Sequence, residues 1–525
     1  MCLEGHARRC PRPARRETRS TLKKILLLVI TSLAGASTSA QDAPNLVSAV
    51  IRGSSVYSAS ELFSVYGERL GKPITTESAR SIANRIADKY VNDGFSRPGI
   101  RIDDRMVTVG VLAIDITETR ISAVDITGDP GPYGTQLRSL GQRLGDDPLL
   151  RSADLQSTMR LMRGLPGLKL TASTQADSGE PGAYRLNVDT EFRPISGTVR
   201  LTNRGTDQIG PQFLLGQVTA NGLFAGRADI GVMFGSASSY GEYHGLGSSA
   251  RIAVHDELSL AVSGFRSRSD PTESPLDRDD RYLRDRLTLG IVKRPFSESN
   301  RQSTLTAGLR AEDLEVARSG TGFRDERLRL IDFGMRFTVR PRSTAQFAAG
   351  FELTKGINGM GSGLHADDLD DDPRSADFSL LVLDFVRVAR LTDFWSWRLN
   401  GFGQYSSDAI PYSQRFKIGG DRLGRGFEVA EIAGDRGIGA KIELTRRLNG
   451  IPDVAGPVSV YSFYDLGAAW KNDEPGRESA ASAGFGLALS GARTNGRIEI
   501  AKPLTHADVE GRRDLRVFVE FAVSW

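Results

Sequence analysis

The sequence has little of several residue types on which common protein functions depend. Its only cysteines, Cys2 and Cys10, lie in a basic leader, so the rest of the chain has no thiol. A disulfide framework, cysteine catalysis and thiolate metal sites are therefore excluded together. The histidines beyond the leader are isolated, and no set of nucleophile, base and orienting residue is recognisable. We expect no enzyme, metal site or cofactor.

Long apolar runs are also missing, except for a short one near the start. Residues 1–40 combine a cationic beginning, the apolar run Ile25–Ile30 and small residues before Gln41. This layout is typical of a secretory signal peptide, and we expect cleavage after Ala40. A membrane anchor is the alternative, but the run is far shorter than the roughly 20 residues of a spanning helix. The chain is therefore predicted to be exported.

The chain that would remain after signal-peptide cleavage has no excess of positive charge. The leader holds eight of the 68 basic residues and two of the 64 acidic residues, so 60 basic and 62 acidic residues remain, a net charge of −2. The basicity belongs to the leader. Nucleic-acid binding consequently loses its main support, and we expect no nucleic acid as a partner.

What is present between residues 41 and 193 is a pattern that occurs twice, in residues 41–118 and 119–193. Each copy shows a strand, two helices and two strands, with helices expected near 59–70, 76–92, 136–143 and 152–163. The strands of the first copy are expected in 46–53, 97–102 and 106–118. Repetition of units this small indicates two tandem α+β domains.

From residue 194 to 525 helical periodicity fades and short alternating segments recur between turn residues. In the last of them, Val517, Val519, Phe521, Val523 and Trp525 share one face. Export, alternation and the lack of spanning helices indicate a transmembrane β-barrel, and a length of this size accommodates roughly sixteen antiparallel strands. A β-sandwich alternates as well and stays open on periodicity alone.

The segment 416–437 is rich in glycine and interrupts this pattern. A phosphate-binding loop would need a lysine, a hydroxyl and a following helix, whereas a strand follows here. A plain hairpin turn has two to five residues, and loops as long as this one are usually functional or disordered. Its interspersed apolar residues Phe427, Val429 and Ile432 argue against disorder. The remaining interpretation is a functional loop that folds into the interior of a hollow structure.

At these residues the sequence resembles the two-partner secretion transporters, also called hemolysin activation/secretion proteins, of the superfamily of outer-membrane barrels that carry POTRA domains. Arg425, Gly426 and Phe427 match the family's motif at the tip of a loop folded back into the barrel. The "FYDLG" segment matches the strand whose carboxylate meets that arginine, and alternation places Asp465 on the lumenal face. The resemblance therefore implies an ion pair between Arg425 and Asp465.

Further matches extend the resemblance over nearly the whole chain beyond the leader: "LPG" at 165–167, "NRG" at 203–205, "GDRG" at 434–437, "IAKPL" at 500–504 and the terminal Trp525. Gly424 departs from the family's usual valine, which we expect to loosen the loop tip slightly. The distance from the expected cleavage site to residue 46 leaves no room for a plug helix, so the internal loop alone is expected to close the barrel.

The resemblance implies that residues 41–118 and 119–193 are POTRA domains in the periplasm and that residues 194–525 form a barrel in the bacterial outer membrane. The partners it implies are a secreted protein, unfolded when received, membrane lipid, and an assembly machinery that reads Phe521 and Trp525. Tyr90, Ile100 and Ile102 are the candidate substrate groove, although packing of Tyr90 within its own domain is the alternative. An assembly factor for other outer-membrane proteins is the rival function, and a passive porin would need no POTRA domains.

Overall fold

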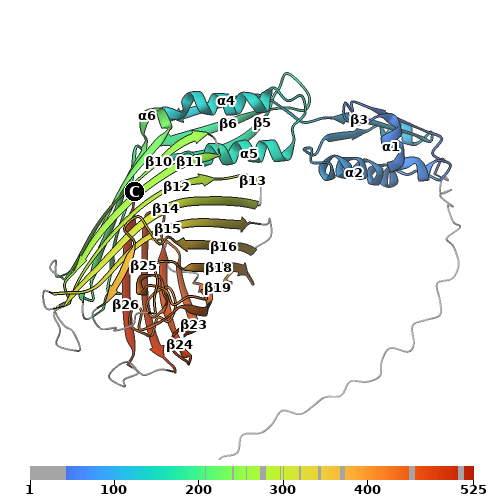
Figure 1. The fold of residues 1–525 in the computed structure, drawn as a ribbon. Coiled ribbons are helices and arrows are strands. Elements are labelled where there is room, and N and C mark those ends of the chain that lie inside the picture. The colour runs from blue at the N-terminus through green and yellow to red at the C-terminus, as the bar shows by residue number, and fades with distance from the viewer. Residues whose placement is uncertain are drawn as a thin grey trace, which may run out of the picture.

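The computed structural model describes residues 43–525 except 207–208, 239–241, 256, 272–279, 296, 299–300, 319–320, 341–344, 367–372, 449–455 and 506–513. The predicted signal peptide lies outside the described residues. Figure 1 shows two small domains of helices and short strands, blue and teal, that lead into a large barrel of long strands.

The first domain packs helices on a three-stranded sheet. Its elements are β1 (Ser48–Arg52), α1 (Ala59–Tyr66), η1 (Gly67–Arg69), α2 (Thr76–Asn92), β2 (Gly99–Ile102), α3 (Asp104–Val107) and β3 (Val111–Thr117). The sheet order is β1-β3-β2, with β1 parallel and β2 antiparallel to β3. Thr75 caps α2 by accepting the Ser78 N–H, which satisfies a free helix-end donor. The apolar stripe of α2, including Ile86, forms one core with Ile114 of β3.

The second domain repeats this arrangement. Its elements are β4 (Arg120–Asp129), η2 (Gly131–Tyr133), α4 (Gly134–Gly145), α5 (Ser152–Arg163), β5 (Leu168–Ala176) and β6 (Ala183–Phe192). The sheet order is β4-β6-β5, with β4 parallel and β5 antiparallel to β6. Two small α+β domains of the same topology therefore precede the barrel, as the sequence repeat predicted.

One strand boundary was predicted wrongly in the first domain. The strand expected from Met106 onward begins at Val111, because residues 104–107 form the short helix α3. The Asp103 side chain accepts the Arg105 N–H at 3.1 Å and starts this helix, and Gly110 turns the chain into β3 with a φ of +80°. Asp103 is a good helix cap, a signal that competes with the β-branched residues around it.

The large domain is a closed antiparallel barrel. Its strands are β7 (Ile195–Thr202), β8 (Phe213–Gly222), β9 (Ala228–Ala237), β10 (Tyr243–His255), β11 (Leu258–Ser269), β12 (Asp280–Lys293), β13 (Ser297–Glu298), β14 (Arg301–Arg318), β15 (Thr321–Val339), β16 (Ala345–Gly356), β17 (Gly363–Ala366), β18 (Ser379–Arg390), β19 (Trp395–Tyr405), β22 (Arg436–Arg447), β23 (Val458–Trp470), β24 (Glu478–Ser490), β25 (Thr494–Pro503) and β26 (Arg516–Ser524). Because β12 pairs with β14 and β16 with β18, the short β13 and β17 are additions to a barrel of 16 strands. Pairing of β26 with β7 closes it.

Side chains alternate between the two faces of the barrel wall as predicted. In β26, Val517 is 52% and Phe521 44% exposed on the outside, whereas Phe518 is 5% and Ala522 7% exposed on the inside. A closed barrel with an apolar outer face is the form in which strands cross a bacterial outer membrane, since every backbone group is paired and no edge is open. The barrel therefore lies in the outer membrane, and the sandwich alternative is excluded. In the described part of the chain no helix is both long and apolar enough to cross a membrane.

The second small domain is joined to the barrel rim by specific contacts. Asn221, near the end of β8, donates from Nδ2 to the Arg193 carbonyl and to the Ser196 hydroxyl, both at 3.0 Å. Gly226, in the turn α6 (Leu223–Gly226), lies directly against the ring of Tyr133, where a Cβ atom would come within 2.6 Å. These contacts place the second domain at the end of the barrel where β8 ends and β9 begins (Figure 1).

Candidate functional site

The glycine-rich segment forms a hairpin inside the barrel. It connects β19 to β22, which are paired with each other in the wall, so the segment leaves the ladder and returns to it. Within it, β20 (Phe416–Ile418) pairs antiparallel with β21 (Ile432–Gly434), and residues 419–431 form the tip. We call residues 416–437 the internal loop and residues 406–415 its entry segment.

Arg425 at the tip is fully buried among three carboxylates of the inner wall. Its Nη2 lies 2.7 Å from Oδ1 of Asp465 and its Nε 3.0 Å from Oδ2 of the same carboxylate. Its Nη1 donates to Glu443 at 2.7 Å and to Glu499 at 3.0 Å. Removing one partner from such a buried cluster costs about 3 to 5 kcal/mol, because a charge is left without compensation. The tip is therefore held by one arginine on carboxylates of β22, β23 and β25.

The backbone of the tip is matched to the same carboxylate. The N–H groups of Gly424 and Arg425 both donate to Oδ2 of Asp465, at 3.3 and 3.1 Å. Gly424 has a φ of +85°, a conformation that favours glycine. The glycine allows the turn that presents both N–H groups to Asp465, and the expectation that Gly424 loosens the tip stays a prediction.

An outer layer of side chains supports the cluster. The Arg425 guanidinium carbon lies 3.5 Å from the ring centroid of Phe463, a cation–π contact. Glu499 also accepts from the Tyr461 hydroxyl and from Nη2 of Arg204, each at 2.9 Å. Arg204 belongs to the "NRG" segment after β7, so this motif reaches the internal loop through Glu499.

Sequence analysis missed Glu443, Glu499 and Arg204 as members of this site. Glu443 and Glu499 are the single carboxylates of their alternating strands, and alternation places them on the same face as Asp465. A charged residue on the lumenal face beside a predicted ion pair was the signal that could have found them.

Small residues let the hairpin lie flat on the inner wall. The side chain of Leu423 packs on Gly439 and Gly467, where Cβ atoms would come within 2.2 and 3.0 Å of it. Gly426 sits against backbone, since a Cβ there would lie 2.7 Å from the Pro503 nitrogen. Phe427 joins the apolar cluster of the hairpin with Ile418. Shape complementarity therefore adds to the ion cluster in seating the loop.

A second buried carboxylate, Asp435, ties the neck of the loop. It accepts from the Ile410 N–H at 3.2 Å, from Nε of Arg415 at 3.2 Å and from the Asn472 N–H at 2.8 Å. These donors come from the entry segment and from the connection after β23. Asp435 lies in the "GDRG" segment, for which the sequence predicted no contacts.

The entry segment reaches another part of the barrel wall. Glu326 of β15, buried, accepts the N–H groups of Tyr412 and Ser413 at 2.9 and 3.1 Å. Both residues lie in the turn η4 (Tyr412–Gln414). The loop is thus fixed at three places, by Glu326 at its entry, Asp435 at its neck and the Arg425 cluster at its tip.

The candidate groove of the first domain needs a correction. Tyr90 is wholly buried, and its hydroxyl donates to Glu118 at 2.7 Å and lies 2.8 Å from the Ser54 hydroxyl, from which it can accept. It belongs to the core and cannot line a groove, because the apolar stripe of α2 that includes Tyr90 faces the sheet. Ile100 and Ile102 are half-buried against the same core. The outer edge of β2 remains available, since β2 is one of the two edge strands of its sheet.

Phe521 and Trp525 lie where the alternation placed them, on the outer face of the last strand. Trp525 also pairs with Gly197 of β7 through its backbone, with N–H to carbonyl distances of 3.1 and 3.3 Å. Its indole lies over Gly197, where a Cβ would come within 2.3 Å of the ring. The terminal residue thus contributes to closing the barrel.

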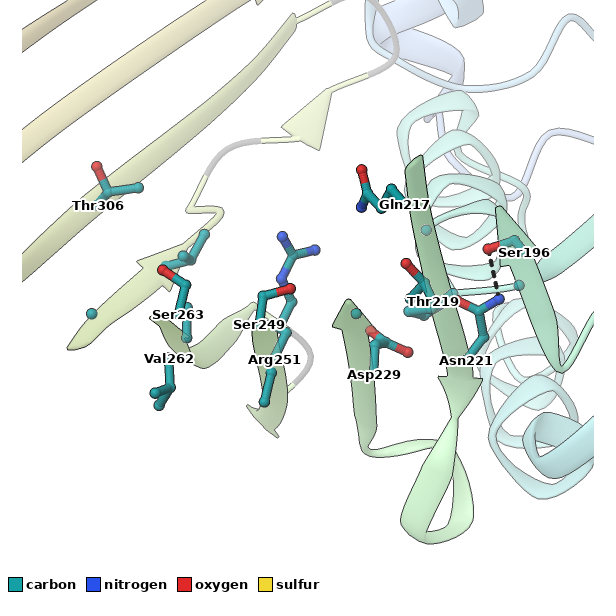
Figure 2. Close-up of a pocket in the computed structure, with 18 of the residues that line it drawn as sticks. Ser196, Gln217, Thr219, Asn221, Asp229, Ser249, Arg251, Val262, Ser263 and Thr306 are labelled. Atoms are coloured by element: carbon teal, nitrogen blue, oxygen red, sulfur yellow. Dashed lines mark hydrogen bonds between the residues drawn. The ribbon is translucent and has the colours of Figure 1, made fainter. Parts of the chain in front are cut away.

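A chamber of about 1100 Å³ opens inside the barrel beside the second domain. Its walls are the inner faces of the strands from β7 to β16, the segment 163–169 and the turn before β25. Figure 2 shows polar side chains from several strands around it, among them Gln217, Thr219, Ser249, Ser263 and Arg251. Most of the labelled side chains are polar and uncharged, which suits passage of a hydrated polymer better than tight binding of an apolar ligand.

The described residues contain no group of three or more histidine, cysteine or acidic side chains arranged to hold a metal ion. The clustered carboxylates instead bind the arginine and backbone groups of the loop. What this arrangement can do chemically is hold a loop across a polar lumen by charge-assisted hydrogen bonds, which are strong but exchangeable with water.

Comparisons with known proteins agree with the fold and the loop. Residues 299–489 match the family model of the haemolysin secretion/activation proteins ShlB/FhaC/HecB. The outer membrane transporter CdiB of Dickeya dadantii (strain 3937) is 21% identical over 445 residues, which are 82% of this chain and 77% of the relative.

Two solved structures share the fold. CdiB from Escherichia coli is 17% identical with a TM-score of 0.69, covering 94% of this chain and 93% of that one. BamA from Haemophilus ducreyi lacking POTRA domains 1–3 is 14% identical with a TM-score of 0.52, covering 92% and 100%. The family match spans the internal loop and Asp465, and together these findings confirm the resemblance to the haemolysin secretion/activation proteins and the location of the barrel in the bacterial outer membrane.

Proposed function

We propose that the protein receives an unfolded partner polypeptide in the periplasm and secretes it through the barrel. The observation that carries this proposal is the burial of Arg425 among Asp465, Glu443 and Glu499. A loop held inside the lumen by polar contacts is a closure that can be exchanged for contacts with a passing chain. A simple porin has no use for such a closure.

The first contact with the partner is assigned to the edge of β2. The sheet order β1-β3-β2 leaves the outer N–H and C=O groups of residues 99–102 without a neighbouring strand in the described structure. An extended peptide can add there as a further strand, and main-chain hydrogen bonds would supply affinity without a fixed sequence. Ile100 and Ile102 pack β2 against the core, and Tyr90 packs α2 against the same core.

The outer face of the barrel indicates the remaining partners. The apolar side chains on this face contact membrane lipid. The last strand, with Phe521 and Trp525, is the segment that an outer-membrane assembly machinery would recognise. The rival function, assembly of other barrels, has no specific observation in its favour here. Partner proteins lost from the medium on gene deletion would distinguish the two, since an assembly factor would instead deplete barrels from the membrane.

The test is removal of residues 46–118 from the exported chain. We expect the partner to stay in the periplasm while the barrel still folds and shows a heat-dependent shift on electrophoresis. Full secretion by the shortened chain would overturn the role given to the first domain.

A further inference from the structure

The chamber beside the second domain is strongly biased in charge. Seven basic residues and three acidic residues line it, a balance of +4, although the chain beyond residue 40 carries about −2. The basic residues are Arg163, Lys169, Arg193, Arg251, Arg286, Arg310 and Arg493. Positive charge is therefore concentrated at the barrel's entrance.

Three of these cations are engaged with the protein's own carboxylates. Arg310 pairs with Asp332 at 2.9 Å, Arg286 with Glu312 at 2.9 Å, and Arg193 with Glu191 at 2.7 Å. The other four, Arg163, Lys169, Arg251 and Arg493, are exposed and form no ion pair within the described parts of the chain. Arg251 acts electrostatically on Asp229, and Lys169 and Arg493 act on Glu191, but without a direct ion pair these side chains remain able to turn towards a ligand.

The four free cations come from separate elements. Arg163 ends α5 and Lys169 lies in β5 of the second domain, Arg251 lies in β10, and Arg493 lies in the turn before β25. They do not converge on one point, as the donors around a single small anion would. They are spread around a chamber large enough for several residues of an extended chain.

We propose that this chamber receives extended segments of the transported polypeptide that carry Asp or Glu side chains. The proposal rests on the proposed function, since it names the chemistry of the chain that would pass. Every residue of an unfolded chain brings an N–H and a C=O that need partners. The hydroxyl and amide side chains of Gln217, Thr219, Ser249 and Ser263 offer such partners in exchange for water. The free cations attract the carboxylates, and the field inside a cleft lined by one sign of charge is focused.

The test measures peptide binding to the full-length protein in detergent by fluorescence anisotropy. Three labelled peptides of roughly twelve residues, about 40 Å when extended, repeat Glu-Ser-Gly, Gln-Ser-Gly or Lys-Ser-Gly. We expect the Glu peptide to bind at least about tenfold more tightly than the Gln peptide at low salt, and this advantage to shrink at high salt because exposed charges are screened. The Lys peptide should bind most weakly.

The triple variant Lys169→Gln, Arg251→Gln, Arg493→Gln should remove most of the advantage of the Glu peptide, while Arg85→Gln should not. Arg85 is exposed on α2 of the first domain and does not line the chamber. Heat-dependent mobility confirms that each variant has a folded barrel. Equal binding of the Glu and Gln peptides to the wild-type chain would overturn the proposal, as would an unchanged triple variant.

A competition experiment distinguishes a polypeptide site from a site for small anions. Inorganic phosphate that displaces the Glu peptide at an ionic strength where chloride does not would contradict a polypeptide site. Failure here is distinguishable from failure of the proposed function. Normal secretion with no preference for the Glu peptide would refute only the peptide site in the chamber. A preference for the Glu peptide without any secreted partner would refute only the secretion function.

Discussion

Arg425 meets Asp465 with two parallel hydrogen bonds, Nη2 to Oδ1 at 2.7 Å and Nε to Oδ2 at 3.0 Å, and both side chains are fully buried. The pair joins a loop to a barrel strand 40 residues further along the chain. Arg425 also forms ion pairs with Glu443 and Glu499, whereas Asp465 accepts hydrogen bonds only from the loop tip in the described contacts. The two residues are therefore not equivalent, and their substitutions should differ.

Replacing Arg425 with Ala should unseat the tip and reduce secretion strongly, because three carboxylates lose their shared cation, at a cost of about 3 to 5 kcal/mol for breaking such a cluster. Asp465→Ala should be milder, since Arg425 keeps Glu443 and Glu499. An exchange of the two residues should not restore function, because an aspartate at 425 would face those two glutamates. Secretion assays of the variants, with barrel folding checked by heat-dependent mobility, decide this. Wild-type secretion from Arg425→Ala would refute the closure role.

Gly426→Ala tests the seating of the loop without touching a charge. A Cβ at this position would lie 2.7 Å from the Pro503 nitrogen and 2.8 Å from the Lys502 carbonyl carbon, and backbone cannot move aside as a flexible side chain can. We expect the tip to lift and secretion to change as in Arg425→Ala. Gly264→Ala is the matched control, since a Cβ there has no heavy atom within 4 Å. Identical behaviour of the two alanine variants would mean that close packing at 426 is unimportant.

How far the sequence predicted this molecule depends on the range of each interaction. The helix bounds 76–92 and 152–163 and the two faces of β26 followed from local periodicity and caps. Asp465 was placed on the inner face by alternation alone. Glu326 could not be linked to the loop, because it lies 86 residues before the Tyr412 N–H that it accepts, and barrel closure alone brings them together. Tyr90 was misplaced because an aromatic on a helix stripe fits core and groove equally well.

Charge on the outer face of the last strand should impair assembly. Phe521 is exposed toward lipid, and an arginine at the bilayer midplane costs about 2 to 4 kcal/mol. Phe521→Arg should lower the yield of folded barrel, and deletion of Trp525 should do the same by removing its backbone pairing with Gly197. Glu520→Gln, one position away on the inner face, should fold normally. A normal yield from Phe521→Arg would contradict the outward assignment.

The first domain should lose stability in acid through Glu118. Burial would raise the pKa of this carboxyl, but hydrogen bonds from Ser55 and Tyr90 outweigh burial and lower it below its ordinary value of 4.5. A lowered pKa in the folded state means that the stabilisation is present above about pH 4.5 and is lost as pH falls through the folded pKa. Hydrogen exchange of residues 54–56, corrected for the intrinsic pH effect, should therefore rise only below that range. Glu118→Gln should show weaker protection at pH 7 and little further change in acid.

Asp435 should control the neck of the loop independently of its tip. In Asp435→Asn one of its three donors, from Ile410, Arg415 or Asn472, faces an amide N–H₂ instead of an oxygen, and a buried donor without a partner costs about 1 to 3 kcal/mol. Because the chain beyond the leader has no cysteine, single introduced cysteines report local opening by maleimide labelling without background. Ile410→Cys reports the neck and Leu423→Cys the tip, since both side chains are almost completely buried.

We expect Asp435→Asn to speed labelling at position 410 at least about fivefold and to leave position 423 protected, since roughly 1 kcal/mol corresponds to such a factor. Arg425→Ala should do the opposite, exposing position 423 first. The reason is that the two carboxylate sites share no hydrogen bond in the described contacts and lie on separate parts of the hairpin. Equal acceleration at both positions in either variant would show that neck and tip open as one unit, and the loop would then have a single closure instead of two.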